Sequence, residues 1–306
     1  MGVPVESWAK QIAENIYPEN SFYKGNCIDD SGQMTGKTVH VIQSGSVPAV
    51  VVNPTTVGGT PVERTDTDAT YDVDVFDFGP IVLLRRDGDF LSYEKRASLL
   101  RDTAQSLTTA IADRVSYNWS PASNMIRTSG AARASYLTTQ TGDRLAIAHK
   151  DILRLATKMT ADDIPQENRK LLVPAWLLED LRLIPEFVDY DKLGYVQQLK
   201  TGIKGSICGF EVYVRSRTTV YTNAATPVKV APGTAAAATH NLSILAWHPD
   251  FVRMSEGGVS NKGIHVFENP DDAIYKGDII SGQAYMGSKI SRDDLKGVYV
   301  LVEKAA

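Results

Sequence analysis

Residues 92–117 read SYEKRASLLRDTAQSLTTAIADRVSY, and this stretch decides the fold class of the chain. Its apolar side chains recur every three or four residues, at Tyr93, Ala97, Leu100, Ala104, Leu107, Ile111 and Val115. That spacing predicts an amphipathic helix, and Ser92 can cap its first turn. About 25 helical residues at ~1.5 Å each make a rod of roughly 37 Å. Because such a rod needs a partner along its length, we expect its stripe to pack on a sheet of its own domain; a coiled-coil dimer is the alternative.

The segment that precedes this helix, residues 37–84, predicts a long β-hairpin. Residues 38–41 alternate between polar and apolar side chains, and so do residues 66–75, which read DTDATYDVDV. In the second run the even positions are polar or acidic, and the odd positions from Ala69 onward are apolar. This period is typical of a strand with one acidic face and one buried face. The Gly/Pro-rich residues 57–61 between the runs are a turn signal, so we expect the two strands to pair.

After the long helix, the chain mixes helix and strand signals. Residues 120–142 are rich in Ser, Thr, Ala and Gly and predict irregular structure. Asp143 can cap a second helix, whose buried face is expected to hold Leu145, Ala148, Ile152, Leu155 and Met159. Strands are predicted at residues 169–173, 207–214, 242–247, 264–267 and 297–302. The order of hairpin, long helix, helix–strand mixture and strands indicates the α+β class.

Composition and charge exclude several classes of protein. The chain has 306 residues, 43% of them apolar and 22% charged, which is ordinary for a folded protein and not for a disordered one. Lys and Arg total 32 against 36 Asp and Glu, so the net charge is -4 and the basic excess of a protein that wraps nucleic acid is missing. Residues 1–10 hold no apolar signal core, and no run of about 18 apolar residues occurs, so we expect no membrane association. Two cysteines, Cys27 and Cys208, are too few for a disulfide framework.

Three weak motifs suggest chemistry, and each has a simpler explanation. Residues 31–38, SGQMTGKT, resemble a phosphate-binding loop, but Ser31 stands at the first glycine position and Thr38 begins a strand signal instead of a helix. The acidic run at residues 66–77 lacks the glycine and the glutamate of a calcium loop. The five histidines have no His or Cys neighbour at metal spacing, and no catalytic serine or cysteine motif occurs. We therefore expect no enzyme activity, no cofactor and no metal.

The order of these elements resembles the major capsid protein of tailed bacteriophages, which has the Hong Kong 97-type fold. The segments that carry the resemblance are Trp8–Asn20 with Phe22, Thr38–Tyr71, Leu91–Tyr117, Ile164–Pro174, Gly205–Val212, Trp247–Asp250 and Gly297–Val302. The resemblance implies an N-terminal arm at residues 1–36, an extended β-hairpin loop at 37–84, a peripheral domain with the spine helix at 85–142, an axial domain at 143–240, and strands that return to both domains at 241–306.

This resemblance implies a structural role in a virion. Copies of the chain would self-assemble as pentamers and hexamers of an icosahedral shell that encloses double-stranded DNA without sequence-specific binding. Portal and scaffold proteins, and in some shells a decoration protein, would be its partners, and the chain would be made in the cytoplasm of a bacterial host. Two alternatives stay open: an encapsulin-like nanocompartment shell protein that encloses enzyme cargo, and a phage nucleotide-binding enzyme built on Gly36-Lys37-Thr38.

The resemblance also suggests contacts between subunits. In this family the extended loop lies across a neighbouring subunit, so we expect its acidic face to meet basic residues there. The residues of that face are Asp66, Asp68, Asp72 and Asp74, and the candidate basic partners are Arg85, Arg86, Lys95 and Arg96. Arg64 of the hairpin and Trp8 of the arm are further candidates for contacts between subunits.

Some relatives join their subunits covalently through a lysine of the extended loop, which attacks an asparagine of a neighbour. This sequence has no lysine between Lys37 and Lys95. The guanidinium of Arg64 stays protonated and is a poor nucleophile, so it cannot replace the lysine. We therefore expect a shell that is held by non-covalent contacts alone.

Overall fold

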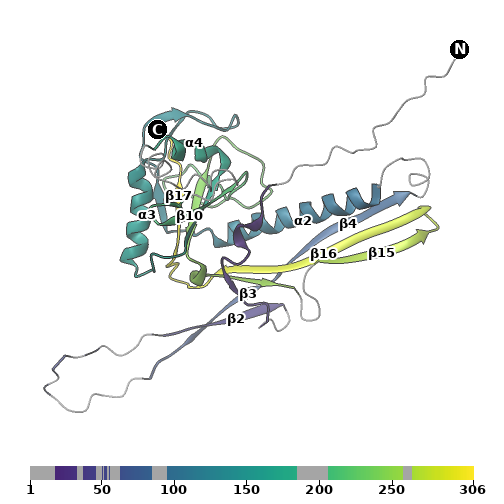
Figure 1. Ribbon diagram of the computed structural model, residues 1–306, viewed down its shortest axis with the longest axis horizontal. Helices are drawn as coiled ribbons and strands as arrows, with labels where there is room; N and C mark the ends of the chain where they lie inside the picture. Colours follow the sequence, from purple (N-terminus) through teal and green to yellow (C-terminus); the bar gives the residue numbers. More distant parts are fainter. Residues whose placement is uncertain are drawn as a thin grey trace.

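The computed structural model describes residues 18–32, 37–45, 50, 52, 53, 55, 63–84, 95–184, 206–257 and 264–306. Within these ranges the chain is α+β, as the sequence predicts. Figure 1 shows two parts: a compact lobe that carries α3 and α4, and a long sheet with helix α2 beside it. The long sheet starts at the lobe and extends away from it.

The extended part is built on a five-stranded sheet. Its strands are β1 (Ile28–Asp29), β4 (Asp74–Leu84), β14 (Val252–Glu256), β15 (Ile264–Asp272) and β16 (Gly277–Ile290). β16 pairs antiparallel with β15 and β4 along the same residues, so these two strands flank it. β14 pairs with the end of β16, and β1 joins β14 in parallel. We call this the peripheral sheet.

Helix α2 (Lys95–Trp119) lies along the peripheral sheet and buries its apolar stripe there (Figure 1). Leu107 and Ile111 are each 6% exposed and share one core with Ala284 and Met286 of β16. The expected packing of the stripe on a sheet of its own chain is therefore confirmed. At these positions no apolar seam is left free for a coiled coil.

The described part of α2 differs from the expected helix at its end. It runs to Trp119 instead of Tyr117, and Trp119 is fully buried where the two parts of the chain meet. Ser92, the expected cap, lies outside the described residues. None of the described helices combines the length and the apolar character that crossing a bilayer requires.

Strand β16 was not predicted from the sequence, although it has 14 residues. Glycines interrupt its apolar pattern, and glycine is unfavourable inside a strand. The structure shows what two of them do. A Cβ atom at Gly282 would lie 2.3 Å from the ring of Phe78, and one at Gly287 would lie 2.9 Å from the ring of Tyr71. The glycines therefore let aromatic rings pack directly against the backbone of β16.

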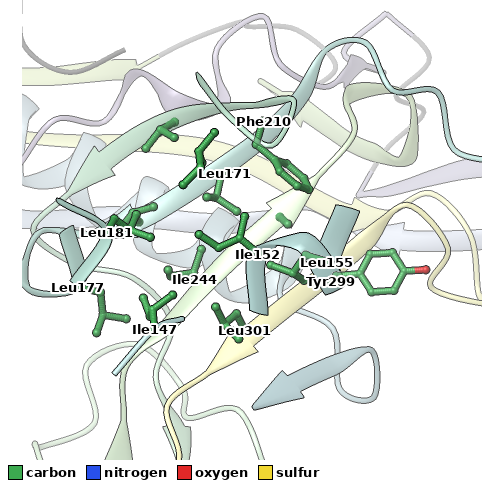
Figure 2. Close-up of a cluster of buried hydrophobic side chains, with 14 of the residues drawn as sticks. Ile147, Ile152, Leu155, Leu171, Leu177, Leu181, Phe210, Ile244, Tyr299 and Leu301 are labelled. Atoms are coloured by element: carbon green, nitrogen blue, oxygen red, sulfur yellow. The ribbon is translucent and has the colours of Figure 1, made fainter. Parts of the chain in front are cut away.

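The compact lobe holds a six-stranded sheet with the order β5-β17-β13-β8-β10-β9. Its strands are β5 (Met125–Arg127), β8 (Arg169–Pro174), β9 (Ser206–Ile207), β10 (Phe210–Arg215), β13 (Ser243–Trp247) and β17 (Val298–Val302). Figure 2 shows Ile152 and Leu155 pointing toward Leu171, Ile244 and Leu301 of the strands. This core lies between the sheet and the helices α3 (His149–Ala161) and α4 (Leu178–Arg182).

The second helix begins later than the sequence predicts. Residues Asp143–Leu145 form strand β7, which pairs with β6 (Ala132–Ala134), so Asp143 caps no helix and Leu145 is not on a helical face. Helix α3 starts at His149, because the Asp151 carboxylate accepts the backbone N–H of Ala148 at 3.1 Å and satisfies a free donor at the helix start. Ile152, Leu155 and Met159 are fully buried, as expected.

Short elements complete the chain. They are the 3-10 turns η1 (Ser21–Tyr23), η2 (Ala175–Leu177) and η3 (Pro249–Phe251), and the strands β2 (Thr38–Gln43), β3 (Thr67–Asp72), β11 (Tyr221–Thr222) and β12 (His240–Asn241). Residues 120–142, which were expected to be irregular, contain β5 and β6.

The segment at residues 18–32 fastens the two parts to each other. Phe22 is 2% exposed, and its ring contacts Trp119 of α2 and Trp247 of β13, with both pairs of ring centroids 6.2 Å apart. Beside it the buried guanidinium of Arg215 donates to Asn20 Oδ1 at 2.9 Å and to Asp113 Oδ1 at 2.6 Å. One aromatic cluster and one buried ion pair therefore join this segment, α2 and the compact lobe.

The packing of α2 predicts a large stability effect at Leu107. Leu107→Ala should lower the free energy of unfolding by about 2–5 kcal/mol, because it removes buried methyl groups and leaves a cavity against β16. Ser106→Ala is the matched control: Ser106 is exposed on the same helix turn, and a surface change of this kind stays within about 0.5 kcal/mol. Urea unfolding followed by circular dichroism measures both. Equal midpoints for the two variants would mean that the stripe is not buried.

Candidate functional site

Strands β2 and β3 form a two-stranded antiparallel ribbon, which we call the hairpin ribbon. Thr38 lies opposite Asp72, and Gln43 lies opposite Thr67. This pairing confirms the β-hairpin that the sequence predicts. The odd-numbered side chains Val39, Val41, Ala69 and Tyr71 are buried, and the even-numbered acidic side chains of β3 are exposed. Apolar residues of the ribbon share a small core with Tyr285 of β16.

Each exposed acidic residue of the ribbon has a partner on its own chain. Asp66 pairs with Arg64 at 2.7 Å, and Asp68 Oδ2 lies 2.6 Å from Nδ1 of His40. Asp72 accepts a hydrogen bond of 2.9 Å from the hydroxyl of Thr38. The acidic side chains lie on one face of the ribbon, as expected. The sequence did not indicate that His40 and Thr38 would be their partners.

These pairs are exposed and leave the acidic face available to a partner. The side chains of His40 and Asp68 are 62% and 50% exposed, and exposed pairs are worth only about 0–1 kcal/mol. The hydrogen bond from Arg64, then that from the backbone N–H of Gly45, lowers the pKa of Asp66, so this carboxylate is charged at neutral pH. Asp72 has a neutral partner, so its charge is not balanced by the Thr38 contact.

Asp74 differs from the other acidic residues. The ladder of β3 ends at Asp72, and after Val73 the chain continues as β4, so Asp74 belongs to the peripheral sheet. Its carboxylate accepts from Arg114 of α2, with Nε to Oδ2 at 2.8 Å. Asp74 thus holds the base of the hairpin to the spine helix. Sequence reasoning missed Arg114. It lies 40 residues from Asp74 in the chain, and no local sequence pattern indicates that the two side chains meet.

Several of the expected contact residues cannot be placed. Trp8, Arg85 and Arg86 lie outside the described residues, and Lys95 and Arg96 start α2 with side chains that are not described. Their role as partners of the acidic face therefore stays a prediction.

The phosphate-loop alternative lacks its structural context. A phosphate loop leads into a helix whose N-terminus holds the anion, whereas Thr38 opens strand β2 and its hydroxyl donates to Asp72. Among the described residues, no group of three or more His, Cys, Asp or Glu side chains is arranged to hold a metal ion.

No protein-family model matches this chain, and no curated protein matches its sequence. Solved structures do match it in fold. A chain from Mycobacterium phage Che8 is 16% identical with a TM-score of 0.66, and the match covers 98% of this chain and 96% of that one. The capsid of cyanophage P-SCSP1u is 15% identical with a TM-score of 0.65, covering 99% and 93%. The mature capsid of bacteriophage PhiM1 is 12% identical with a TM-score of 0.67, covering 98% and 91%.

These matches cover nearly the whole of this chain and more than nine tenths of each matched chain. The chain therefore has the fold of tailed-phage capsid proteins, the Hong Kong 97-type fold, and the resemblance read from the sequence is confirmed at the level of the fold.

Proposed function

We propose that this chain is the major capsid protein of a tailed bacteriophage, and that its copies form the pentamers and hexamers of an icosahedral shell around double-stranded DNA. The observation that carries the proposal is the fold match to phage capsids over 98–99% of the chain and more than nine tenths of each matched chain. The match leaves no large unmatched segment within this sequence.

The surface chemistry supports a container that does not grip its contents. The net charge is -4, so the chain has no basic excess to bind DNA phosphates. Mild repulsion between a shell of this charge and packed DNA favours release of the genome. The DNA inside would be held by the closed shell and not by sequence-specific contacts.

The proposal also covers partners and location. A portal protein would replace one pentamer, a scaffold protein would guide assembly, and a decoration protein would be an optional addition on the outside. The subunit would be made in the cytoplasm of a bacterial host and would end in the virion. It would have no catalytic activity of its own.

Electron microscopy of the purified protein is the most direct test. We expect shells, tubes or capsomer rings, and particles from infected cells should contain DNA. Shells that contain enzyme cargo and no DNA would favour the nanocompartment alternative. A monodisperse small protein that binds ATP, with no assemblies under any condition, would contradict the proposal.

The acidic face predicts a charge-sensitive assembly step. Asp72→Lys should block particle formation, because the face would repel the basic surface of a neighbouring copy. The subunit should stay folded, since Asp72 is exposed and contacts only a hydroxyl. Asp74 is left unchanged, because its ion pair with Arg114 belongs to the subunit itself. Sedimentation velocity and negative-stain microscopy measure assembly, and circular dichroism measures folding.

Glu167→Lys is the control for that reversal. Glu167 is exposed on the compact lobe, so the change alters the net charge by the same amount without touching the hairpin ribbon. Normal particles from Asp72→Lys, or an equal defect in Glu167→Lys, would mean that the acidic face has no specific partner.

The absence of a lysine between Lys37 and Lys95 predicts how the finished shell is held together. Particles boiled in detergent and reductant should give a single band near 33.4 kDa on a denaturing gel, because Lys37 lies at the base of the hairpin and the rest of the loop has no amine to attack a neighbour. A ladder of larger species that survives this treatment would reveal a covalent link formed by another residue.

A further inference from the structure

A chain of polar contacts ties the base of the hairpin ribbon to the peripheral sheet. From β3, the hydroxyl of Tyr71 donates to Asp30 Oδ2 at 3.2 Å, and Arg253 Nη1 donates to Asp30 Oδ1 at 2.8 Å. Arg253 Nε then donates to Ser291 Oγ at 2.9 Å, and from β2 Gln43 Nε2 donates to the backbone oxygen of Ser291 at 3.2 Å. Both strands of the ribbon thus enter one set of contacts. We call these five residues the hairpin latch.

Asp30 is the centre of the latch. It is 1% exposed, and Arg253 of β14 supplies the opposite charge that makes its burial tolerable. Burial, and then the negative charge of Asp30, raises the pKa of Tyr71, so its hydroxyl keeps its proton at neutral pH and can donate to Asp30. The backbone oxygen of Arg253 accepts from Trp119 Nε1 at 3.2 Å. The latch is therefore braced by the end of helix α2.

Other features of the described part of the chain also hold the base of the ribbon: β3 continues into β4 through Val73, and Asp74 at the start of β4 is paired with Arg114 of α2. The ribbon is not hydrogen-bonded into the ladder of the peripheral sheet. Besides the latch, it contacts this sheet through a small apolar core with Tyr285, and Lys289 Nζ donates to the Thr70 backbone oxygen at 3.4 Å. The ring of Tyr71 fits only because Gly287 has no side chain, as a Cβ there would lie 2.9 Å from it. One tyrosine thus carries both the apolar and the polar part of the attachment.

There is open space beside the latch. A polar cleft of about 230 Å³ lies along β2, open to solvent, and its lining residues are Val41, Ile42, Gln43, Ser44, Asp250, Phe251, Ser291 and Arg292. Two of these, Gln43 and Ser291, belong to the latch itself. The ribbon therefore has open space on the side that faces η3, and a tilt in that direction would shift the small apolar core that it shares with Tyr285.

We propose that the hairpin latch is a conformational lock. While Tyr71 is bonded to Asp30, the ribbon leaves the peripheral sheet in one direction; when that bond is lost, the ribbon tilts toward the cleft. The lock is a property of the single subunit and does not depend on assembly. Its consequence for a shell, that unlatched subunits give particles of mixed shape, rests on the proposed function.

Distance measurement between two spin labels tests the lock directly on the unassembled full chain. The labels are placed at Thr67→Cys on β3 and Ser106→Cys on α2, both exposed positions, with Cys27 and Cys208 replaced by serine. The parent protein should give one narrow distance distribution. Tyr71→Phe keeps the ring and removes only the hydroxyl, so it should broaden the distribution or add a second distance. Gly287→Ala should have the same effect, because its methyl group would displace the ring of Tyr71 from the backbone of β16.

Tyr285→Phe is the matched control. It removes a hydroxyl next to the same apolar core, but that hydroxyl donates to Gln283 and not to the latch. Its distance distribution should match the parent. Asp30→Asn, which keeps the shape of the side chain and removes its charge, replaces Gly287→Ala as the second variant if the latter does not fold by circular dichroism.

Two results would overturn the lock. One is a narrow, unchanged distance in Tyr71→Phe, whatever the second variant gives. The other is equal broadening in Tyr71→Phe and Tyr285→Phe, which would reflect general loosening of the core. Microscopy of particles assembled from the same variants tests the proposed function, whereas the spin-label distances in the unassembled chain test the lock. A failure of one is therefore distinguishable from a failure of the other.

Discussion

The burial of one helical stripe against one long strand is the constraint on which the rest of this structure depends. Helix α2 has apolar residues along one side only, and Leu107 and Ile111 on that side pack against β16. On the part of the helix before Ile111, the residues Arg101, Gln105, Ser106 and Ala110 are exposed, so this region of the described chain is one helix on one sheet. Every residue from Ile111 to Trp119 is buried or half-buried, because the end of the helix packs at the compact lobe. At the end of the helix, Trp119 enters the aromatic cluster with Trp247, which couples this thin part to the compact lobe.

Two polar residues in the C-terminal half of the same helix hold two other segments of the chain in place. Asp113 holds Arg215, and through it Asn20 at the root of the N-terminal segment. The next residue, Arg114, holds Asp74 at the base of the hairpin. Consecutive helical residues point about 100° apart, since there are about 3.6 residues in a turn. One turn of α2 can therefore hold Asn20 and the base of the hairpin at different positions around the helix.

The edges of the peripheral sheet are shaped against uncontrolled pairing. Two of the edge strands, β4 and β15, contain a proline at a register shift: Pro80 of β4 lies between the residues paired with Ile280 and Gly282, and Pro270 of β15 lies between Asn269 and Asp272. A proline offers no backbone N–H, and an irregular edge does not accept another strand readily. Contacts between copies at these edges would therefore depend on side chains, which favours a closed shell of defined geometry over open-ended sheet growth.

The sequence alone determined the elements whose signal is local. The stripe of residues 92–117 and the alternation of residues 66–75 each require only that one side be buried, whatever the partner is. The structure confirms the helix over the described residues from Lys95 and the paired strand over Thr67–Asp72. The tertiary structure decided the rest. Gly282 and Gly287 of β16 are needed because the rings of Phe78 and Tyr71 pack against them. His40, Thr38 and Arg114 are the partners of Asp68, Asp72 and Asp74. These contacts join residues that are far apart in the chain, so the pattern within any one stretch of sequence cannot contain them.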